Sequence, residues 1–339
     1  MKRAILADIA ASAGVTPATV SYYFSGRKKI SAPVVEKITE AAKKLNYTPI
    51  HAASTGRPKR IINMCVSMEN GDLSGDVYYL GLMNGIMNCL VEEGYQLMFS
   101  RLVYGDTESH SHFLKSLELV DGVILCNPRQ DHRFEDEFQE RNIPFVILGA
   151  SEKKDSVFYV DVDMRGIGFQ GADYFLAGGH RNILYLNMPE TMTQSQHRLE
   201  GFRMAYVRRG LVFNESDHFY APVGMEDAFE LVKKLLSEDR HYTAAVTANE
   251  LLGQGVVRAA RELRINIPAK LEVLSMGGSV LGTCTVPALT IIDFNSRRHG
   301  YEAAKLLLEI LHRKRVTPFH LILPGSLVER GSTRACYRH

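Results

Sequence analysis

The sequence contains no tryptophan, only five cysteines and no apolar run of the ~18–20 residues that a membrane-spanning helix needs. The cysteines are far apart and form no C-x-x-C pair, and the twelve histidines are equally scattered. These absences argue against a disulfide framework, a zinc site and a metal-dependent active site. No Ser-His-Asp arrangement or isolated carboxylate pair stands out either, so we expect neither a cofactor nor an enzyme. A reducing cytoplasm fits the cysteine usage best.

Charge is present but unevenly distributed. Residues 1–60 hold eleven Lys and Arg against three Asp and Glu, whereas the remaining residues hold 29 basic against 35 acidic side chains. The first sixty residues therefore carry +8 and the rest −6, a split that the overall charge of +2 conceals. A basic unit joined to an acidic one predicts that the amino-terminal unit binds the phosphates of a nucleic acid.

The amino-terminal unit has the pattern of a helix-turn-helix. The run ILADIAASAGVTPATVSYYFSG (residues 5–26) predicts two short helices joined by a tight turn at Gly14. The Thr16 hydroxyl can cap the second helix, and Pro17 suits its first position. A third helix is expected after a cap at Ser31. The second helix then presents one face away from the small core, formed by Pro17, Ala18, Ser21 and Tyr22.

From Ile61 onward, apolar runs alternate with amphipathic helices, after a Pro-, Gly- and Lys/Arg-rich linker at 47–60. Runs such as GVILC and FVILG are typical of parallel strands covered on both faces. Helices are expected near 78–93, 106–118, 133–141, 166–178, 196–209, 225–237, 249–263 and 296–312, and FHLILPGSLVER as a final β segment. Two such α/β blocks predict two doubly wound subdomains, which bind ligands at the carboxyl ends of their strands.

The run DIAASAGVTPATVSYYFSGRKKISAPVVEKITEAAKKLNYTP resembles the DNA-binding head of the lactose-repressor/galactose-repressor family of bacterial transcription regulators. Later segments, among them GGHRNILYL, TAAVTANELLGQGVV and LVERGST, resemble the family in the same order, over essentially the whole chain. The resemblance implies an α/β chain with an N-terminal all-α helix-turn-helix head and a periplasmic-binding-protein-like core of two doubly wound parallel-sheet subdomains. We expect the head at 1–46, the hinge at 47–60 and the core at 61–339, with an N-subdomain of about 61–161 and 292–323 and a C-subdomain of about 162–291 and 324–339.

The same resemblance implies a cytoplasmic homodimer that binds double-stranded operator DNA as a repressor. Operator affinity would be modulated by a small-molecule effector in the cleft between the subdomains, with no membrane involved. DNA contacts would come from Thr16, Pro17, Ala18, Ser21, Tyr22, Lys29, Ser31 and Arg57. Lys28, Lys59 and Arg60 are also interpreted as phosphate contacts. Tyr22 stands where the family usually has an arginine, which can donate two hydrogen bonds to a guanine edge. A tyrosine cannot make this contact, because it has a single hydroxyl.

The hinge departs from the family at Gly56. Relatives place a leucine there that wedges into the minor groove, and glycine has no side chain to insert. Glycine also costs ~1 kcal/mol of helix propensity relative to alanine. Whether a hinge helix forms, with Ala52 and Ala53 packing across the dimer axis, stays open.

The resemblance assigns five residues to the effector: Tyr78, Tyr79, Arg198, Asn249 and Phe294. Core packing is the alternative for the tyrosines and a surface ion pair for Arg198. For Asn249 the alternative is a helix cap, and the family uses either this residue or the acid beside it, here Glu250, at the cleft. In LEVLSMGGSV, Ser275 to Gly278 replace the Gly-aromatic-Asp pattern of the family. A carboxylate acceptor for sugar hydroxyls is therefore expected to be missing, and a conventional monosaccharide or purine is the less expected effector.

Two alternatives to a small-molecule-controlled regulator remain. The same DNA-binding role could be controlled by a protein corepressor docking on the core. More remotely, GIGFQG at 166–171 fits the G-x-G-x-x-G pattern of a dinucleotide-binding enzyme. That enzyme would need an acidic residue at the end of the next strand, where this sequence has Asn187.

Overall fold

The amino-terminal unit is a bundle of three short helices. The computed structural model describes residues 6–25, 30–45, 59–68, 77–103, 106–126, 133–149, 151, 156–221, 225–238, 241–315 and 317–334. Gly14 has φ +66°, a left-handed conformation that glycine adopts without steric cost. The Thr19 amide donates to the Thr16 hydroxyl over 3.2 Å, so the expected cap of the second helix is present. The helices are α1 (Leu6–Ala13), α2 (Pro17–Ser25) and α3 (Ala32–Lys44), packed around Ile9, Val20 and Ile38.

Ser31 precedes α3 but does not cap it with its side chain. Its hydroxyl makes no capping hydrogen bond, and its backbone oxygen accepts from the Val34 and Val35 amides at 3.0 Å each. Ser31 therefore occupies the expected N-cap position, but its hydroxyl takes no part in the cap. Pro33, which fixes a helical φ in the first turn, supports the start of this helix instead.

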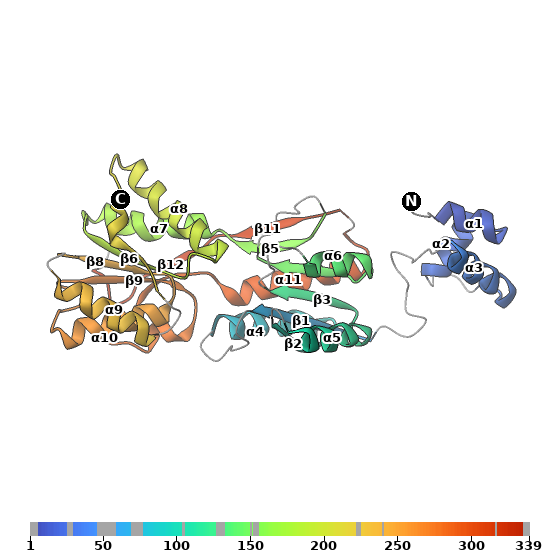
Figure 1. The fold of residues 1–339 in the computed structure, drawn as a ribbon, viewed down its shortest axis with the longest axis horizontal. Helices are drawn as coiled ribbons and strands as arrows, with labels where there is room; N and C mark the ends of the chain where they lie inside the picture. Colours follow the sequence, from blue (N-terminus) through green and yellow to red (C-terminus); the bar gives the residue numbers. More distant parts are fainter. Residues whose placement is uncertain are drawn as a thin grey trace.

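The first lobe of the core is a six-stranded parallel sheet with helices on both faces (Figure 1). Its strand order is β11-β5-β4-β3-β1-β2. Helices α4 and α11 cover one face, and α5 and α6 cover the other. The bounds are β1 (Ile61–Met68), α4 (Val77–Glu92), β2 (Gln96–Val103), α5 (Thr107–Ser116), η1 (Leu117–Leu119), β3 (Gly122–Cys126), α6 (Arg133–Glu140), β4 (Phe145–Leu148), β5 (Tyr159–Val162), α11 (Ser296–Leu311) and β11 (His320–Leu323).

The second lobe repeats this plan, with α7 and α8 on one face of its sheet and α9 and α10 on the other. Its strand order is β12-β10-β9-β8-β6-β7, and only the edge strand β12 runs antiparallel to its neighbour. The bounds are α7 (Met164–Ala177), β6 (Ile183–Asn187), α8 (Thr193–Arg208), η2 (Glu215–Asp217), β7 (His218–Tyr220), α9 (Met225–Ser237), β8 (Ala244–Thr247), α10 (Glu250–Glu262), β9 (Glu272–Gly277), η3 (Val280–Thr283), β10 (Thr290–Asp293) and β12 (Ser326–Val328).

The chain passes between the lobes three times, after β5, after β10 and between β11 and β12. The last passage splits the expected final β segment into two strands that belong to different sheets. Pro324 and Gly325 lie at this split. Three adjacent connections make the boundary between the lobes a natural place for bending. The numerical limits of head, hinge and subdomains given above stay predictions.

The GIGFQG run lies wholly within α7, where its glycines serve helix packing. A Cβ atom on Gly168 would lie 2.0 Å from the Arg198 carbonyl oxygen of α8, and one on Gly201 would lie 1.9 Å from the Arg165 oxygen of α7. Asp163 caps the helix, because its Oδ1 accepts the Gly166 amide at 2.8 Å. The glycines thus let α7 and α8 cross closely. The GIGFQG run is part of a helix and does not form a phosphate-binding loop.

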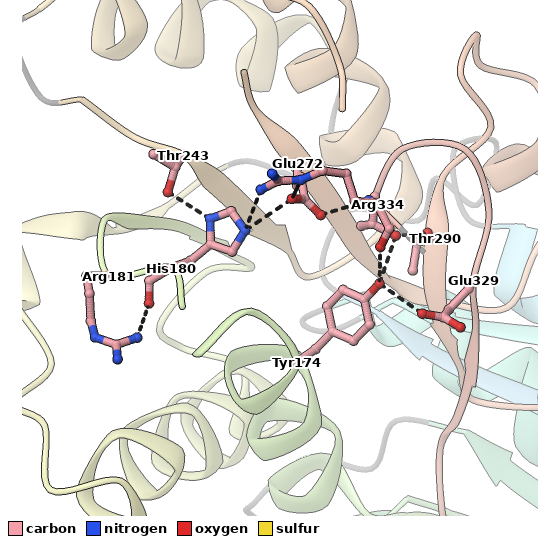
Figure 2. Close-up of polar contacts among 9 residues, drawn as sticks. Tyr174, His180, Arg181, Thr243, Glu272, Thr290, Glu329 and Arg334 are labelled. Atoms are coloured by element: carbon pink, nitrogen blue, oxygen red, sulfur yellow. Dashed lines mark hydrogen bonds and ion pairs between the residues drawn. The ribbon is translucent and has the colours of Figure 1, made fainter. Parts of the chain in front are cut away.

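A buried polar network holds the segment after β12 to the second lobe (Figure 2). Glu272 lies at its centre with a side chain 1% exposed. Its Oε1 accepts from Arg334 Nε at 2.5 Å and lies 3.1 Å from His180 Nε2, while its Oε2 accepts the Arg334 amide at 2.9 Å. The Tyr174 hydroxyl lies 2.9 Å from Thr333 Oγ1. The network thereby ties the last described residues to α7 and β9.

Within the described part of the chain, no helix is both long and apolar enough to cross a bilayer.

Candidate DNA-reading helix and effector cleft

The reading face of α2 is exposed as expected. Thr16, Pro17 and Ala18 are exposed, and Tyr22 is 42% exposed. Tyr23, its neighbour, packs into the head core, and its hydroxyl lies 3.0 Å from Thr39 Oγ1. One of the two adjacent tyrosines is thus turned outward and the other inward. The side chain of Ser21 and residues Lys28, Lys29, Gly56 and Arg57 lie outside the described residues.

Lys59 and Arg60 are attached to the first lobe. Lys59 Nζ donates to the backbone oxygen of Glu118, and its amide donates to Asp121 Oδ1 at 3.2 Å. Arg60 Nη1 donates to the Glu93 oxygen at 2.7 Å. These hydrogen bonds hold the start of the core, and the interpretation of the two residues as phosphate contacts stays a prediction.

The cleft holds a cavity of about 150 Å³ that both lobes line. It lies at the carboxyl ends of β3, β4 and β9, where doubly wound sheets bind their ligands. The structure brings all five predicted effector residues to its wall: Tyr78, Tyr79, Arg198, Asn249 and Phe294. Their assignment to an effector stays a prediction, but their meeting at one cavity is what it requires.

Tyr78 lies in the first turn of α4 and contacts both lobes. Its ring packs edge-on against Phe294, with centroids 6.3 Å apart, and its hydroxyl lies 2.8 Å from His299 Nδ1. His299 Nε2 lies 2.8 Å from the Val160 oxygen, which can only accept, so Nε2 carries the proton and Nδ1 accepts from Tyr78. Burial lowers the pKa of His299 to about 4, which keeps the ring neutral at pH 7. Tyr79 is 8% exposed and packs in the first-lobe core as well as lining the cavity.

Arg198 is 4% exposed and enters the cavity from α8. Its guanidinium lies 3.4 Å from Ser195 Oγ and 3.7 Å from Met164 Sδ, and it also interacts with the Tyr185 hydroxyl. Among the described residues it forms no ion pair. The alternative of a surface ion pair is therefore wrong for this arginine.

A carboxylate does lie where one was expected to be missing. Glu250 is 6% exposed and lines the cavity, and its Oε1 accepts the Gly278 amide at 2.8 Å and the Ser279 amide at 2.6 Å. A Cβ atom on Gly277 would lie 2.0 Å from Glu250 Oε2, so the glycine makes room for this side chain. The expectation that the site lacks an acceptor for hydroxyl groups is corrected, since α10 supplies it in place of the loop after β9.

Asn249 has both roles that the sequence left open. Its Oδ1 accepts the Leu252 amide at 2.8 Å and caps α10, while its Nδ2 lies 3.3 Å from Met188 Sδ at the cavity wall. Sequence reasoning missed His299 and Asp161, which also line the cavity. The sequence signalled them only by position: His299 lies in the first turn of α11, and Asp161 lies in β5, just before the chain passes to the second lobe.

Comparisons with known proteins agree with this architecture. Residues 5–49 match the family model described as bacterial regulatory proteins, lacI family, and residues 172–333 match the periplasmic binding protein-like domain. The chain therefore has a lacI-family head followed by a periplasmic-binding-protein-like domain. The family assignment and the fold expected from the sequence are thereby confirmed.

The match to named lacI-family regulators extends over the whole chain. The HTH-type transcriptional regulator CelR of Thermobifida fusca is 27% identical, with 98% of each chain covered. The ribose operon repressor of Escherichia coli K12 is also 27% identical, with 97% of this chain and 99% of the repressor covered. A solved CelR–cellobiose complex is 26% identical with a TM-score of 0.74, covering 97% of this chain and all of that one. These lacI-family relatives are named as regulators rather than enzymes.

Asp161 should make the stability of the protein depend on pH. Burial raises the pKa of Asp161 from 3.8 to about 6, against a backbone hydrogen bond that lowers it. The native state therefore keeps a proton that the unfolded chain has lost between pH 4 and pH 6. Its stabilising effect is complete below about pH 4 and is lost as the pH rises through 6. We expect the melting temperature of Asp161→Asn, relative to the wild type, to rise from pH 4 to pH 7; parallel curves would contradict the assignment.

Proposed function

We propose that the protein is a homodimeric repressor that reads operator DNA with α2 and responds to a small molecule bound in the interlobe cleft. The observation that carries this proposal is the cavity built by polar side chains of both lobes. The cavity wall includes Tyr78 and Asp161 from one lobe and Arg198 and Glu250 from the other. A ligand that contacts both lobes stabilises conformations with one interlobe angle relative to conformations with other angles. In a dimer, that angle sets the spacing of the two heads on a near-palindromic operator.

The DNA-binding part of the proposal rests on the head. α2 exposes Pro17, Ala18 and Tyr22 on one side and buries Val20 on the other, which is the arrangement a recognition helix needs. The named relatives are transcriptional regulators and repressors, which supports the same role. We expect selection from a random duplex pool to recover a two-fold symmetric sequence. No enrichment of any duplex at moderate salt, with or without metabolites, would overturn this role.

We place the dimer contact on α4. Leu80, Met87 and Val91 follow one another at helical spacing on its outer face, and Val91 is 73% exposed. An exposed apolar stripe of this kind suits a self-complementary contact between two copies of the chain. Asn84 lies within the same stripe and is exposed.

Val91→Glu should therefore raise the dimer dissociation constant at least about tenfold, because a contact around a two-fold axis buries two unpaired carboxylates. Sedimentation velocity over a concentration series measures the change. Val212→Glu is the matched control, since Val212 is 92% exposed on the second lobe and lies off this stripe. If Val91→Glu dimerises with the same dissociation constant as the wild type, the interface lies elsewhere.

A further inference from the structure

A buried histidine lies where three separate segments of the chain meet beside the cleft. His299 is 2% exposed and belongs to the first turn of α11, directly after the chain has passed from β10 into the first lobe. Its Nε2 lies 2.8 Å from the Val160 oxygen of β5, and its Nδ1 lies 2.8 Å from the Tyr78 hydroxyl of α4. One imidazole ring therefore joins α11, β5 and α4 by hydrogen bonds.

The Val160 oxygen is a fixed anchor for this ring. It also accepts the Gly149 amide at 2.9 Å, so both of its lone pairs are used. Gly149 follows β4 and lines the cavity, and Val160 lies two residues before the end of β5, where the chain passes to the second lobe. His299 is thereby attached to the ends of two parallel strands, one of which leads directly into the other lobe.

His299 also restrains the orientation of Tyr78. Because a backbone carbonyl only accepts, His299 Nε2 donates to Val160, and the neutral ring leaves Nδ1 to accept from Tyr78. The tyrosine ring packs edge-on against Phe294, with centroids 6.3 Å apart, and Phe294 belongs to the passage between β10 and α11. The hydrogen bond thus holds Tyr78 against the connection that enters from the second lobe.

Helices α4 and α11 pack too closely to move independently. A Cβ atom on Gly85 of α4 would lie 1.9 Å from the Arg297 oxygen, and one on Gly300 of α11 would lie 2.1 Å from the Leu82 oxygen. Backbone therefore meets backbone in the turn of α11 that contains His299. A shift of this turn has to move α4 as well, and the outer face of α4 carries the proposed dimer contact.

We propose that His299 is a positioning residue that couples the effector cleft to the dimer contact, because it holds Tyr78 and α4 to the β5 passage between the lobes. This role rests on the proposed function, since it names the contact through which the interlobe angle reaches the dimer. A change of angle acts on the passages after β5 and β10; His299 is bonded to the first and directly follows the second. Removal of the ring should redistribute the interlobe angles even without a ligand.

The operator affinity of the unliganded full chain tests this role by fluorescence anisotropy with the selected operator. His299→Leu removes both hydrogen bonds, and Tyr78→Phe removes the shared proton while its ring keeps the contact with Phe294. We expect each variant to change the affinity in the same direction, at least about threefold. The double variant should change it no further than the larger single effect, because both substitutions break one chain of bonds. Additive or opposite effects overturn the coupling.

A conservative variant and a matched control separate coupling from stability. His299→Asn keeps an acceptor near the place of Nδ1, so it should recover about half of the change in binding free energy caused by His299→Leu, and only while Tyr78 is present. His312→Leu makes the same substitution at an exposed position after α11 and should change operator affinity less than about twofold. A purely structural histidine would lower the melting temperature of His299→Leu and leave operator affinity unchanged, which contradicts the role.

Nitrogen NMR of the full chain labelled at histidine reports the ring directly. The His299 signal is identified by its loss in His299→Leu. We expect a neutral ring with its proton on Nε2 at pH 7, as the two hydrogen bonds require. A charged ring, or a proton on Nδ1, overturns the assignment.

The outcomes distinguish this role from the function on which it rests. Wild-type operator affinity in both His299→Leu and Tyr78→Phe overturns the coupling through His299 and leaves the ligand-controlled repressor standing. If the wild type itself prefers no duplex, the proposed function fails, and the coupling role fails with it.

Discussion

Ala18→Glu is expected to lower operator affinity at least about 100-fold. Ala18 is exposed in the first turn of α2, on the face proposed to enter the major groove. A carboxylate there is repelled by the DNA phosphates and occupies the space between the helix and the base edges. The substitution should leave the head folded, because an acidic residue near a helix amino terminus is favourable. Fluorescence anisotropy with the selected operator measures the affinity, and circular dichroism checks the fold.

The control is Ala11→Glu, which places the same charge on an exposed position of α1. Because Ala11 lies off the reading helix, this variant should lose only a small part of what Ala18→Glu loses. Equal losses in the two variants would show that general charge repulsion, and not the face of α2, decides binding. Effector affinity should be unchanged in both variants.

Gly201→Ala is expected to destabilise the second lobe by about 3 kcal/mol, near the upper end of overpacking costs. Its new methyl group would lie 1.9 Å from the Arg165 oxygen and 2.9 Å from the Phe169 amide nitrogen, both backbone atoms of α7. Backbone atoms cannot rotate away, so α7 and α8 must separate. Denaturant unfolding measures the loss of stability.

Effector affinity should fall in the same variant. Arg198 belongs to the turn of α8 whose carbonyl packs on Gly168, so a shift of α8 moves the guanidinium from its place in the cavity. Met204→Ala is the control, because Met204 is 55% exposed on the outside of α8 and its loss should change stability by less than about 0.5 kcal/mol. A Gly201→Ala protein as stable as this control would show that the crossing is looser than the structure indicates.

Local patterns were enough to predict most of the fold. The helix expected at 225–237 is α9 with the same bounds, and the run FVILG contains β4, because amphipathic spacing and continuous apolar runs are properties of neighbouring residues. Local pattern indicated one β segment at 319–330, and only the resemblance divided it between the subdomains after residue 323. Which sheet each half of FHLILPGSLVER joins depends on β5 and β10, more than 30 residues away.

The site was predictable only where a residue's place was enough. Tyr78, Arg198 and Phe294 line the cavity as predicted. The role of Glu250 stayed open, because only the fold shows that its carboxylate lies against Gly277. Composition likewise counted Lys59 and Arg60 with the DNA-binding charge and could not show that each also donates to a carbonyl of the first lobe. Contacts between distant segments decide such cases, and no local pattern records them.

The most direct test of the account is a closed thermodynamic cycle on the full chain with its selected operator and the best effector. Operator affinity is measured with and without saturating effector, and effector affinity with and without saturating operator. We expect the two ratios to agree and to differ from one at least about fivefold, because coupling between two sites is reciprocal. Operator affinity that stays constant at saturating effector would contradict control of the head through the cleft.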